Sequence, residues 1–256
     1  MMRRRVRLIA SGRELLRIRG HYGIDAPYVP LYMGAGGAGL ALAAVVLAAI
    51  GQSWWPVLAD AAVASLASTG LYLYCTLRGK LVVWARILAS LRLRGDERAL
   101  DVGCGRGAVL LMVAKLLPRG HVVGLDLWKT SDQSGNDPAA TLANARAEGV
   151  ADRVELVTGD MRAMALPDRG FDLVTSSLAI HNIPEAAGRR TALDEMIRVL
   201  RPGGRIVIVD IRATTEYAAQ LSARGLQDVV ERSVGWQGWF GGPWVPCRVV
   251  MARAAG

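Results

Sequence analysis

Three glycines, Gly103, Gly105 and Gly107, form the cluster whose spacing most directly indicates chemistry in this sequence. They separate a short apolar run at 98–102, which predicts a strand, from a helical stretch at 108–117. A strand-to-helix turn without side chains lets the backbone approach a ligand, and the first turn of the helix offers free N–H groups. The cluster therefore predicts a ligand-binding turn, although the turn alone does not identify the ligand.

Three acidic residues are expected at strand ends around this turn. Asp101 stands just before the first glycine, where a carboxylate would oppose a pyrophosphate but suit a cationic amino-acid group. Asp126 ends a second strand at 121–126, which places a bidentate acceptor where ribose hydroxyls would lie. Asp160 follows a third strand at 154–158 and could accept a hydrogen bond from an adenine amino group. Together the acids favour a cationic nucleoside.

A dinucleotide is the alternative ligand. The pattern Gly103-x-Gly105-x-x-Ala108 satisfies a looser dinucleotide fingerprint, which would make the chain a nicotinamide-dependent oxidoreductase. We identify no catalytic Tyr–Lys or similar pair for that reaction in the sequence. This alternative is therefore the weaker of the two.

Short apolar runs alternate with helical stretches from residue 99 onward, which is typical of a mostly parallel sheet with helices on both faces. A fourth and a fifth strand are expected at 171–175 and 205–210, and residues 201–204 (Arg-Pro-Gly-Gly) should form the tight turn into the fifth. The glycines and the acids should then meet in a common cleft at one edge of the sheet.

Five segments resemble the motifs of class I S-adenosylmethionine-dependent methyltransferases, and they occur in the family's order. These segments are 100–107, 124–126, 159–160, 171–174 and 198–205. The stretch 177–185 (Ser-Leu-Ala-Ile-His-Asn-Ile-Pro-Glu) resembles the segment after strand four in the subgroup that contains ubiquinone/menaquinone C-methyltransferases. The resemblance covers about residues 96–256. It implies an α/β fold with a Rossmann-like sheet of seven strands, the last antiparallel, whose strands six and seven would come from 229–239 and 247–252.

The resemblance also implies S-adenosylmethionine as the cofactor. The three glycines would contact its methionine part, Asp126 its ribose, and Asp160 with Met161 its adenine. The complete set of expected cofactor-binding residues is Asp101, Gly103, Cys104, Gly105, Gly107, Asp126, Leu127, Asp160, Met161 and Ser176. A polar loop at 129–138 is longer than expected and could cap the cofactor or meet the substrate. No metal ligands are expected, because the three cysteines follow no metal-ligand spacing and are interpreted as free thiols.

His181 is the best candidate for a general base, because it lies on the loop after strand four, near the expected acceptor side. The alternative is a structural histidine whose ring orders that loop, and the resemblance favours this alternative. An aromatic run near the C-terminus could line an acceptor pocket or touch a bilayer, or it could simply pack in a core. Its members are Trp236, Trp239, Phe240 and Trp244.

Two apolar stretches, 31–51 and 54–77, are each long enough to cross about 30 Å of hydrocarbon as helices. Only a short link separates them, so they predict an antiparallel transmembrane hairpin, with Trp54 and Trp55 at an interface. A soluble hairpin that serves as a dimer interface or a lid is the alternative, and the acidic Asp60 is its best support. A cleaved signal peptide fits less well, because a second apolar stretch follows the first at once.

The basic residues are concentrated before residue 99. Residues 1–98 carry 13 Lys and Arg against 5 Asp and Glu, whereas residues 99–256 carry 18 against 17. Nucleic acid is therefore not expected as a partner, because phosphate binding needs clustered cations on the catalytic part. The positive flanks of both apolar stretches predict that the two ends of the hairpin, and the domain that follows, face the cytoplasm.

The sequence thus predicts four parts: a basic cytoplasmic segment (1–30), the transmembrane hairpin (31–77), a basic linker helix (78–95) and the methyltransferase domain (96–256). The expected protein is a multi-pass protein of the cell inner membrane that transfers a methyl group to a small acceptor, either lipophilic or a thiol. Assembly of copies through the hairpin stays open. A catalytically silent membrane scaffold with the same fold is the alternative.

Overall fold

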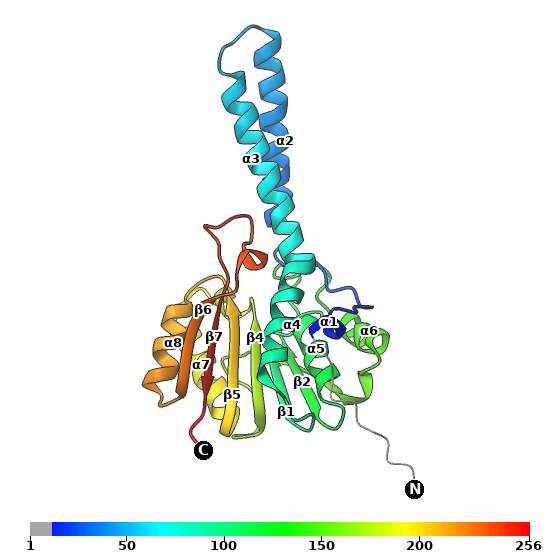
Figure 1. The fold of residues 1–256 in the computed structure, drawn as a ribbon, viewed down its shortest axis with the longest axis vertical. Coiled ribbons are helices and arrows are strands. Elements are labelled where there is room, and N and C mark those ends of the chain that lie inside the picture. Colours follow the sequence, from blue (N-terminus) through cyan, green and yellow to red (C-terminus); the bar gives the residue numbers. More distant parts are fainter. Residues whose placement is uncertain (1–11) are drawn as a thin grey trace.

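A seven-stranded sheet forms the centre of the computed structural model, which describes residues 12–256 (Figure 1). The strand order is β3-β2-β1-β4-β5-β7-β6, and the first five strands run parallel while β7 pairs antiparallel with both β5 and β6. The strands are β1 (Arg98–Val102), β2 (His121–Asp126), β3 (Val154–Thr158), β4 (Phe171–Ser177), β5 (Leu200–Asp210), β6 (Gln227–Ser233) and β7 (Arg248–Arg253). The predicted fold class, with its single antiparallel strand, is confirmed.

Helices cover both faces of this sheet, as its apolar strands require. On one face α4 (Lys80–Leu91) and α5 (Ala108–Leu116) bury side chains such as Trp84, which is fully buried. On the other face α7 (Ala186–Val199) and α8 (Thr214–Ala223) bury side chains such as Tyr217. The helix α6 (Pro138–Glu148) joins the first of these two layers through Ala145. Alternate residues of one strand therefore belong to different cores, since strand side chains point to opposite faces.

Strand β5 is longer than predicted. The Arg-Pro-Gly-Gly segment at 201–204 lies inside it as an irregularity rather than before it as a separate turn. The pairing with β4 jumps from Phe171↔Leu200 to Leu173↔Arg205, which leaves these residues outside the regular ladder. Gly203 has a positive φ of 72°, so this position takes up the left-handed conformation that the irregularity needs.

The two apolar stretches form an antiparallel pair of helices that projects away from the sheet (Figure 1). They are α2 (Tyr28–Ala49) and α3 (Trp55–Tyr74). Both belong to helices that are long and apolar enough to cross a membrane, with mean hydropathies of 1.9 and 1.3. Small residues bring them together: Gly37 faces Leu66, and Ser65 donates a hydrogen bond to the carbonyl of Met33.

The second helix of the pair does not stop at the domain boundary. It continues through a π-helical turn, η1 (Cys75–Gly79), into α4, and the whole helix spans Trp55–Leu91. The segment 78–95, predicted as a basic linker helix, is helical as far as Leu91, and the apolar face of α4 lies on the sheet. A C-terminal turn, η4 (Trp236–Gly238), packs against η1 so closely that a Cβ on Gly79 would overlap the Gln237 carbonyl oxygen.

The segment before α2 crosses the domain surface and contacts the helix α6. The helix α1 (Gly12–Leu15) buries Leu15 in the core, and the following backbone hydrogen-bonds to Asn144 and Glu148 of α6. The predicted basic N-terminal segment, 1–30, is described in part, because residues 1–11 and their four arginines lie outside the described residues.

Candidate cofactor site and acceptor side

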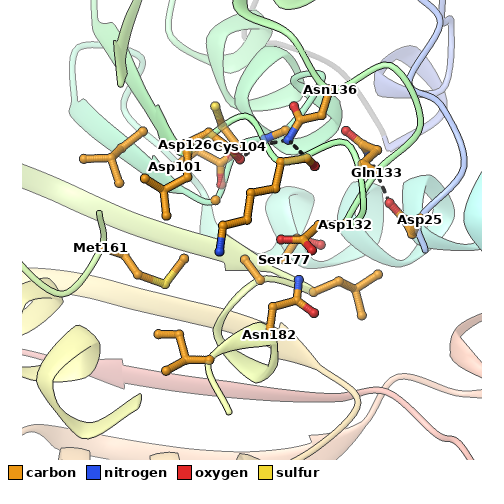
Figure 2. A pocket seen from close by; sticks show the side chains of 18 of the residues that line it. Asp25, Asp101, Cys104, Asp126, Asp132, Gln133, Asn136, Met161, Ser177 and Asn182 are labelled. Atoms are coloured by element: carbon orange, nitrogen blue, oxygen red, sulfur yellow. Dashed lines mark hydrogen bonds between the residues drawn. The ribbon is translucent and has the colours of Figure 1, made fainter. Parts of the chain in front are cut away.

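A cavity opens at the carboxyl ends of β1, β2, β3 and β4, where the sheet fold places ligands. Figure 2 shows the side chains that converge on it from the glycine turn, the strand ends and the loop after β2. Eight of the predicted cofactor-binding residues line it: Asp101, Gly103, Cys104, Gly105, Asp126, Leu127, Asp160 and Met161.

The glycine turn adopts backbone conformations and close approaches that other residues would disturb. Gly103 and Gly105 have φ values of 72° and 49°. A Cβ on Gly103 would overlap the Cβ of Ala179, and one on Gly105 would lie 2.5 Å from Gln133 Oε1. Gly107 does not line the cavity but begins α5, where its carbonyl accepts a hydrogen bond from Leu111 N. The turn thus forms a cradle whose floor is backbone.

Asp126 is held rigidly at the end of β2. Its Oδ2 accepts from Gly105 N at 2.8 Å, and its Oδ1 accepts from Trp128 N at 2.6 Å and from Asn136 Nδ2 at 3.1 Å. A carboxylate offers about four lone-pair positions, so three of these bonds leave capacity for a ligand hydroxyl. The carboxylate therefore lies fixed at the cavity wall and can still accept hydrogen bonds.

Asp101 is the most unusual acid of the site, because only 1% of its surface is exposed. Burial raises its pKa to about 7, although Thr175 Oγ1 and Leu110 N both donate to its carboxylate and oppose that shift. A cationic ligand beside it would favour the ionised form. This geometry fits the ammonium group of an amino acid better than a phosphate.

Asp160 lines the cavity just after β3, the strand that pairs with β2. Its carboxylate accepts from Arg162 Nε at 3.0 Å, and this hydrogen bond is the main reason why the pKa of Asp160 is lowered. The acid is thus ionised at neutral pH and can accept a hydrogen bond from a ligand amino group. Met161, the next residue, adds an apolar surface to the same wall.

Comparisons with known proteins agree with this geometry. Residues 100–208 match the family described as "Methyltransferase domain". A solved SAM-dependent methyltransferase from Aquifex aeolicus has the same fold, with a TM-score of 0.53 and 20% identity, over 67% of this chain and 89% of that one. This segment is a class I S-adenosylmethionine-dependent methyltransferase domain. Its cofactor is S-adenosylmethionine, and the backbone cradle with the buried Asp101 carboxylate fits that cationic nucleoside.

Two further comparisons show that this fold does not by itself determine the reaction. The cyclase SpnF shares the methyltransferase fold, with a TM-score of 0.54 and 20% identity, over 69% of this chain and 82% of that one. The demethylmenaquinone methyltransferase of Staphylococcus aureus is 33% identical over 135 residues. That match covers 52% of this chain and 51% of the relative, so the chain spans about half the length of the curated relatives it matches. The fold alone therefore does not determine the reaction, which depends on the residues of the site.

The loop after β2 covers the cavity of the methyltransferase domain. Lys129, Asp132, Gln133 and Asn136 all line the cavity, so the polar loop predicted at 129–138 lies at the cofactor site. The Gln133 side chain accepts from Arg106 N at 2.7 Å and donates to Asp25 at 3.0 Å. This side chain therefore connects the glycine turn to the segment that precedes the hairpin.

Two residues of the cavity wall, Asp25 and Lys80, are missing from the sequence-based prediction. Lys80 Nζ lies 2.8 Å from Asp25 Oδ2, and the exposed fractions of their side chains are 7% and 16%. Thr76 Oγ1 also donates to Asp25. A lone acid before an apolar stretch gives no sign of its partner 55 positions later. They are identified only in the folded structure, where the two opposite charges are buried together and neutralise each other.

Ser176 and His181 lie outside this cavity. Ser176 is fully buried and donates to the Val102 carbonyl, whereas its neighbour Ser177 lines the cavity and accepts from Trp84 Nε1. Adjacent strand residues point to opposite faces of the sheet, so the cavity is lined by Ser177 and not by the predicted Ser176, one position earlier.

The ring of His181 lies beside Asp210, a fully buried acid at the end of β5. Its Nδ1 is within ion-pair distance of Asp210 Oδ1, and its backbone N donates to the same carboxylate at 3.2 Å. The ring contact is close, but its angle is not that of a hydrogen bond, so Nδ1 has no hydrogen-bond partner in residues 12–256. His181 belongs to η3 (Ile180–Asn182) and faces a second cavity beside the first.

Proposed function

We propose that this chain is a membrane-anchored methyltransferase that transfers a methyl group from S-adenosylmethionine to a small acceptor with lipophilic character. The observation that carries the reaction is the cavity in which a backbone cradle, the buried Asp101 and the fixed Asp126 converge. An intact cradle with both acids favours turnover over a catalytically silent scaffold, and Asp101 disfavours the pyrophosphate of a nicotinamide cofactor.

The residues of the cavity have separate tasks in this proposal. Asp101 would hold the cationic amino-acid end of the cofactor, Asp126 the ribose hydroxyls, and Asp160 with Met161 the adenine. When bound, S-adenosylmethionine supplies an electrophilic methyl group, so the protein has to supply alignment and exclude water. The loop that contains Gln133 already lies over the glycine turn, where it would limit access of water to the cofactor.

The membrane anchor is the hairpin of α2 and α3. A helix of 22 residues is about 33 Å long, which matches the hydrocarbon thickness of a bilayer. Exposed aromatic residues lie near both ends: Tyr28 and Tyr32 at the domain, Trp54 and Trp55 at the tip. Asp60 is exposed in the second turn of α3, close enough to the tip to reach water. With the flanking arginines, these features support a catalytic domain on the cytoplasmic side.

A lipophilic acceptor is supported by the anchor and by one relative. A hairpin that holds the site beside a bilayer raises the effective concentration of a membrane-dissolved substrate. The relative from Staphylococcus aureus is named a demethylmenaquinone methyltransferase, which is consistent with such an acceptor for this chain.

Cofactor binding tests the enzymatic part of this proposal. Calorimetry with S-adenosylhomocysteine should show binding to the unaltered protein and a loss of at least about tenfold in affinity for Asp126→Ala, because a charge-assisted hydrogen bond contributes about 1.5–3 kcal/mol. Asp152→Ala, which removes an exposed acid paired only with its neighbour, should bind normally. Equal affinity in all three proteins would refute the assigned site.

Membrane topology is tested separately. A Q52C variant places a thiol between α2 and α3 in a chain whose native cysteines are all buried. In intact cells a membrane-impermeant maleimide should label this thiol, and the protein should stay in the membrane pellet after carbonate extraction. Extraction into the soluble fraction would refute the anchor. Labelled S-adenosylmethionine with a membrane lipid extract, and in parallel with a small-thiol panel, then identifies the acceptor class.

A further inference from the structure

A second cavity, of about 460 Å³, lies between the base of the hairpin and the carboxyl edge of the sheet. Its wall comes from the base of the hairpin, with the segment just before α2, and from the loops after β2, β4 and β5. The C-terminal loop 239–246 closes the remaining side. It shares Asp25, Asp132, Leu178 and Asn182 with the cofactor cavity, so the two cavities adjoin. A molecule in the second cavity would therefore lie next to a cofactor in the first.

The outer part of this second cavity is apolar and well packed. Phe240 is 7% exposed and packs edge-on against Tyr72, with ring centroids 5.4 Å apart. Gly241 has a positive φ of 92° and directs its open side to Met33, whose Cε would lie 3.3 Å from a Cβ at that position. The contact brings the C-terminal loop against the base of α2. An apolar wall thus comes jointly from the hairpin and the domain.

The cavity is also lined by polar groups, and their formal charges, with that of Lys80, sum to zero. Asp25 forms an ion pair with Lys80. The other two charged residues of the lining, Asp132 and the exposed Arg212, are opposite in sign. His181 turns Nδ1 toward Asp210, which leaves its Nε2 edge for a ligand. A neutral head group with a hydrogen-bonding hydroxyl suits this end better than a phosphate or an ammonium group.

The mouth of the cavity lies where the domain would meet the bilayer surface. Trp244 and Tyr28, both on the wall, are 72% and 52% exposed, and Tyr32 beside them is 73% exposed. Figure 1 shows the C-terminal loop that contains Trp244 rising beside the base of the hairpin. Exposed aromatic residues favour the membrane interface. An amphiphile dissolved in the bilayer would thus reach the mouth without crossing water.

We propose that this cavity is the acceptor site, and that it takes a neutral amphiphile whose hydroxyl head lies at His181 and whose apolar body lies along Met33 and Phe240. The acceptor enters sideways from the bilayer at the base of the hairpin. This inference rests on the proposed function, because it assigns the acceptor for the same reaction. It makes the hairpin a wall of the active site as well as an anchor.

Photolabelling of the full chain in lipid nanodiscs tests the proposal. The probe is 4-octylphenol with a diazirine in its alkyl chain, and labelled peptides are identified by mass spectrometry. Label on 239–246 should be competed by unlabelled 4-octylphenol, whereas label on the lipid-facing surface of α2 should not. The variant Met33→Trp, which fills the cavity, should lose at least about tenfold of the label on 239–246. The control Leu42→Trp, at an exposed position farther along α2, should lose none.

The head group is tested with a second probe and a second variant. His181→Ala should weaken competition by 4-octylphenol severalfold and leave competition by octylbenzene, which lacks a hydroxyl, unchanged. Undiminished labelling of 239–246 in Met33→Trp would overturn the proposal. Binding of S-adenosylhomocysteine is measured in the same samples and should be equal in both tryptophan variants. If the unaltered protein did not bind S-adenosylhomocysteine, the proposed function would be refuted instead, and the labelling would still show whether the second cavity binds 4-octylphenol.

Discussion

Gly103→Ala is the substitution for which the structure gives the clearest expected magnitude. Gly103 has a φ of 72°, and a side chain there costs about 1–2 kcal/mol for the left-handed conformation alone. In addition its Cβ would overlap Ala179, so the loop after β4 would have to move. Overpacking of this kind costs about 1–3 kcal/mol more. The variant should therefore lose about 2–5 kcal/mol of folding free energy.

Gly149→Ala is the matched control, because Gly149 has the same φ of 72° and a Cβ added there would have no other atom within 4 Å. It should lose only the conformational part, about 1–2 kcal/mol. Thermal unfolding measures both losses, and calorimetry should show at least a tenfold loss of S-adenosylhomocysteine affinity for Gly103→Ala alone. Equal destabilisation of the two variants, with equal affinity, would refute the argument that close approach at Gly103 shapes the site.

Three further predictions concern buried groups. Burial raises the pKa of Asp101 to about 7, so cofactor affinity should fall as pH drops below 7 and the carboxylate becomes protonated. The contribution of Asp101 to the free energy of unfolding should fall as pH rises from about 4 to 7, because only the unfolded chain then loses the proton readily. Calorimetry and unfolding across this pH range check both effects, with Asp101→Asn as the pH-insensitive control. Gly37→Leu should lower the unfolding temperature in detergent and Gly39→Leu should not, since only the former faces the other helix. Lys80→Met should cost about 3–5 kcal/mol by thermal unfolding, and a second change, Asp25→Asn, should restore part of it.

Local patterns were sufficient to predict the framework of this protein. The first three strands begin and end at the predicted residues, because short apolar runs that end at Gly or Asp are local signals. Asp126 and Asp160 line one cavity because successive parallel strands end at one edge of the sheet. The paired apolar helices follow in the same way from their length and short link.

Long-range contacts could not be predicted from such patterns. The pairing of Asp25 with Lys80 and of His181 with Asp210 depends on how distant elements pack. The exchange of Ser176 for Ser177 depends on which face each strand residue takes, and a strand that is buried on both faces, as β4 is, shows no alternation that would fix it. The second cavity was indicated only by the aromatic run near the C-terminus.

If α2 and α3 anchor the protein as proposed, the continuous helix from Trp55 to Leu91 has a mechanical consequence. A transmembrane helix adapts to a thinner or thicker bilayer by changing its tilt. Here the C-terminal part of the same helix packs Trp84 against the sheet, so a change in the tilt of its apolar part would also rotate the catalytic domain relative to the membrane. The height at which the cavity mouth meets the lipid would then vary with acyl-chain length, and turnover in vesicles should report that thickness.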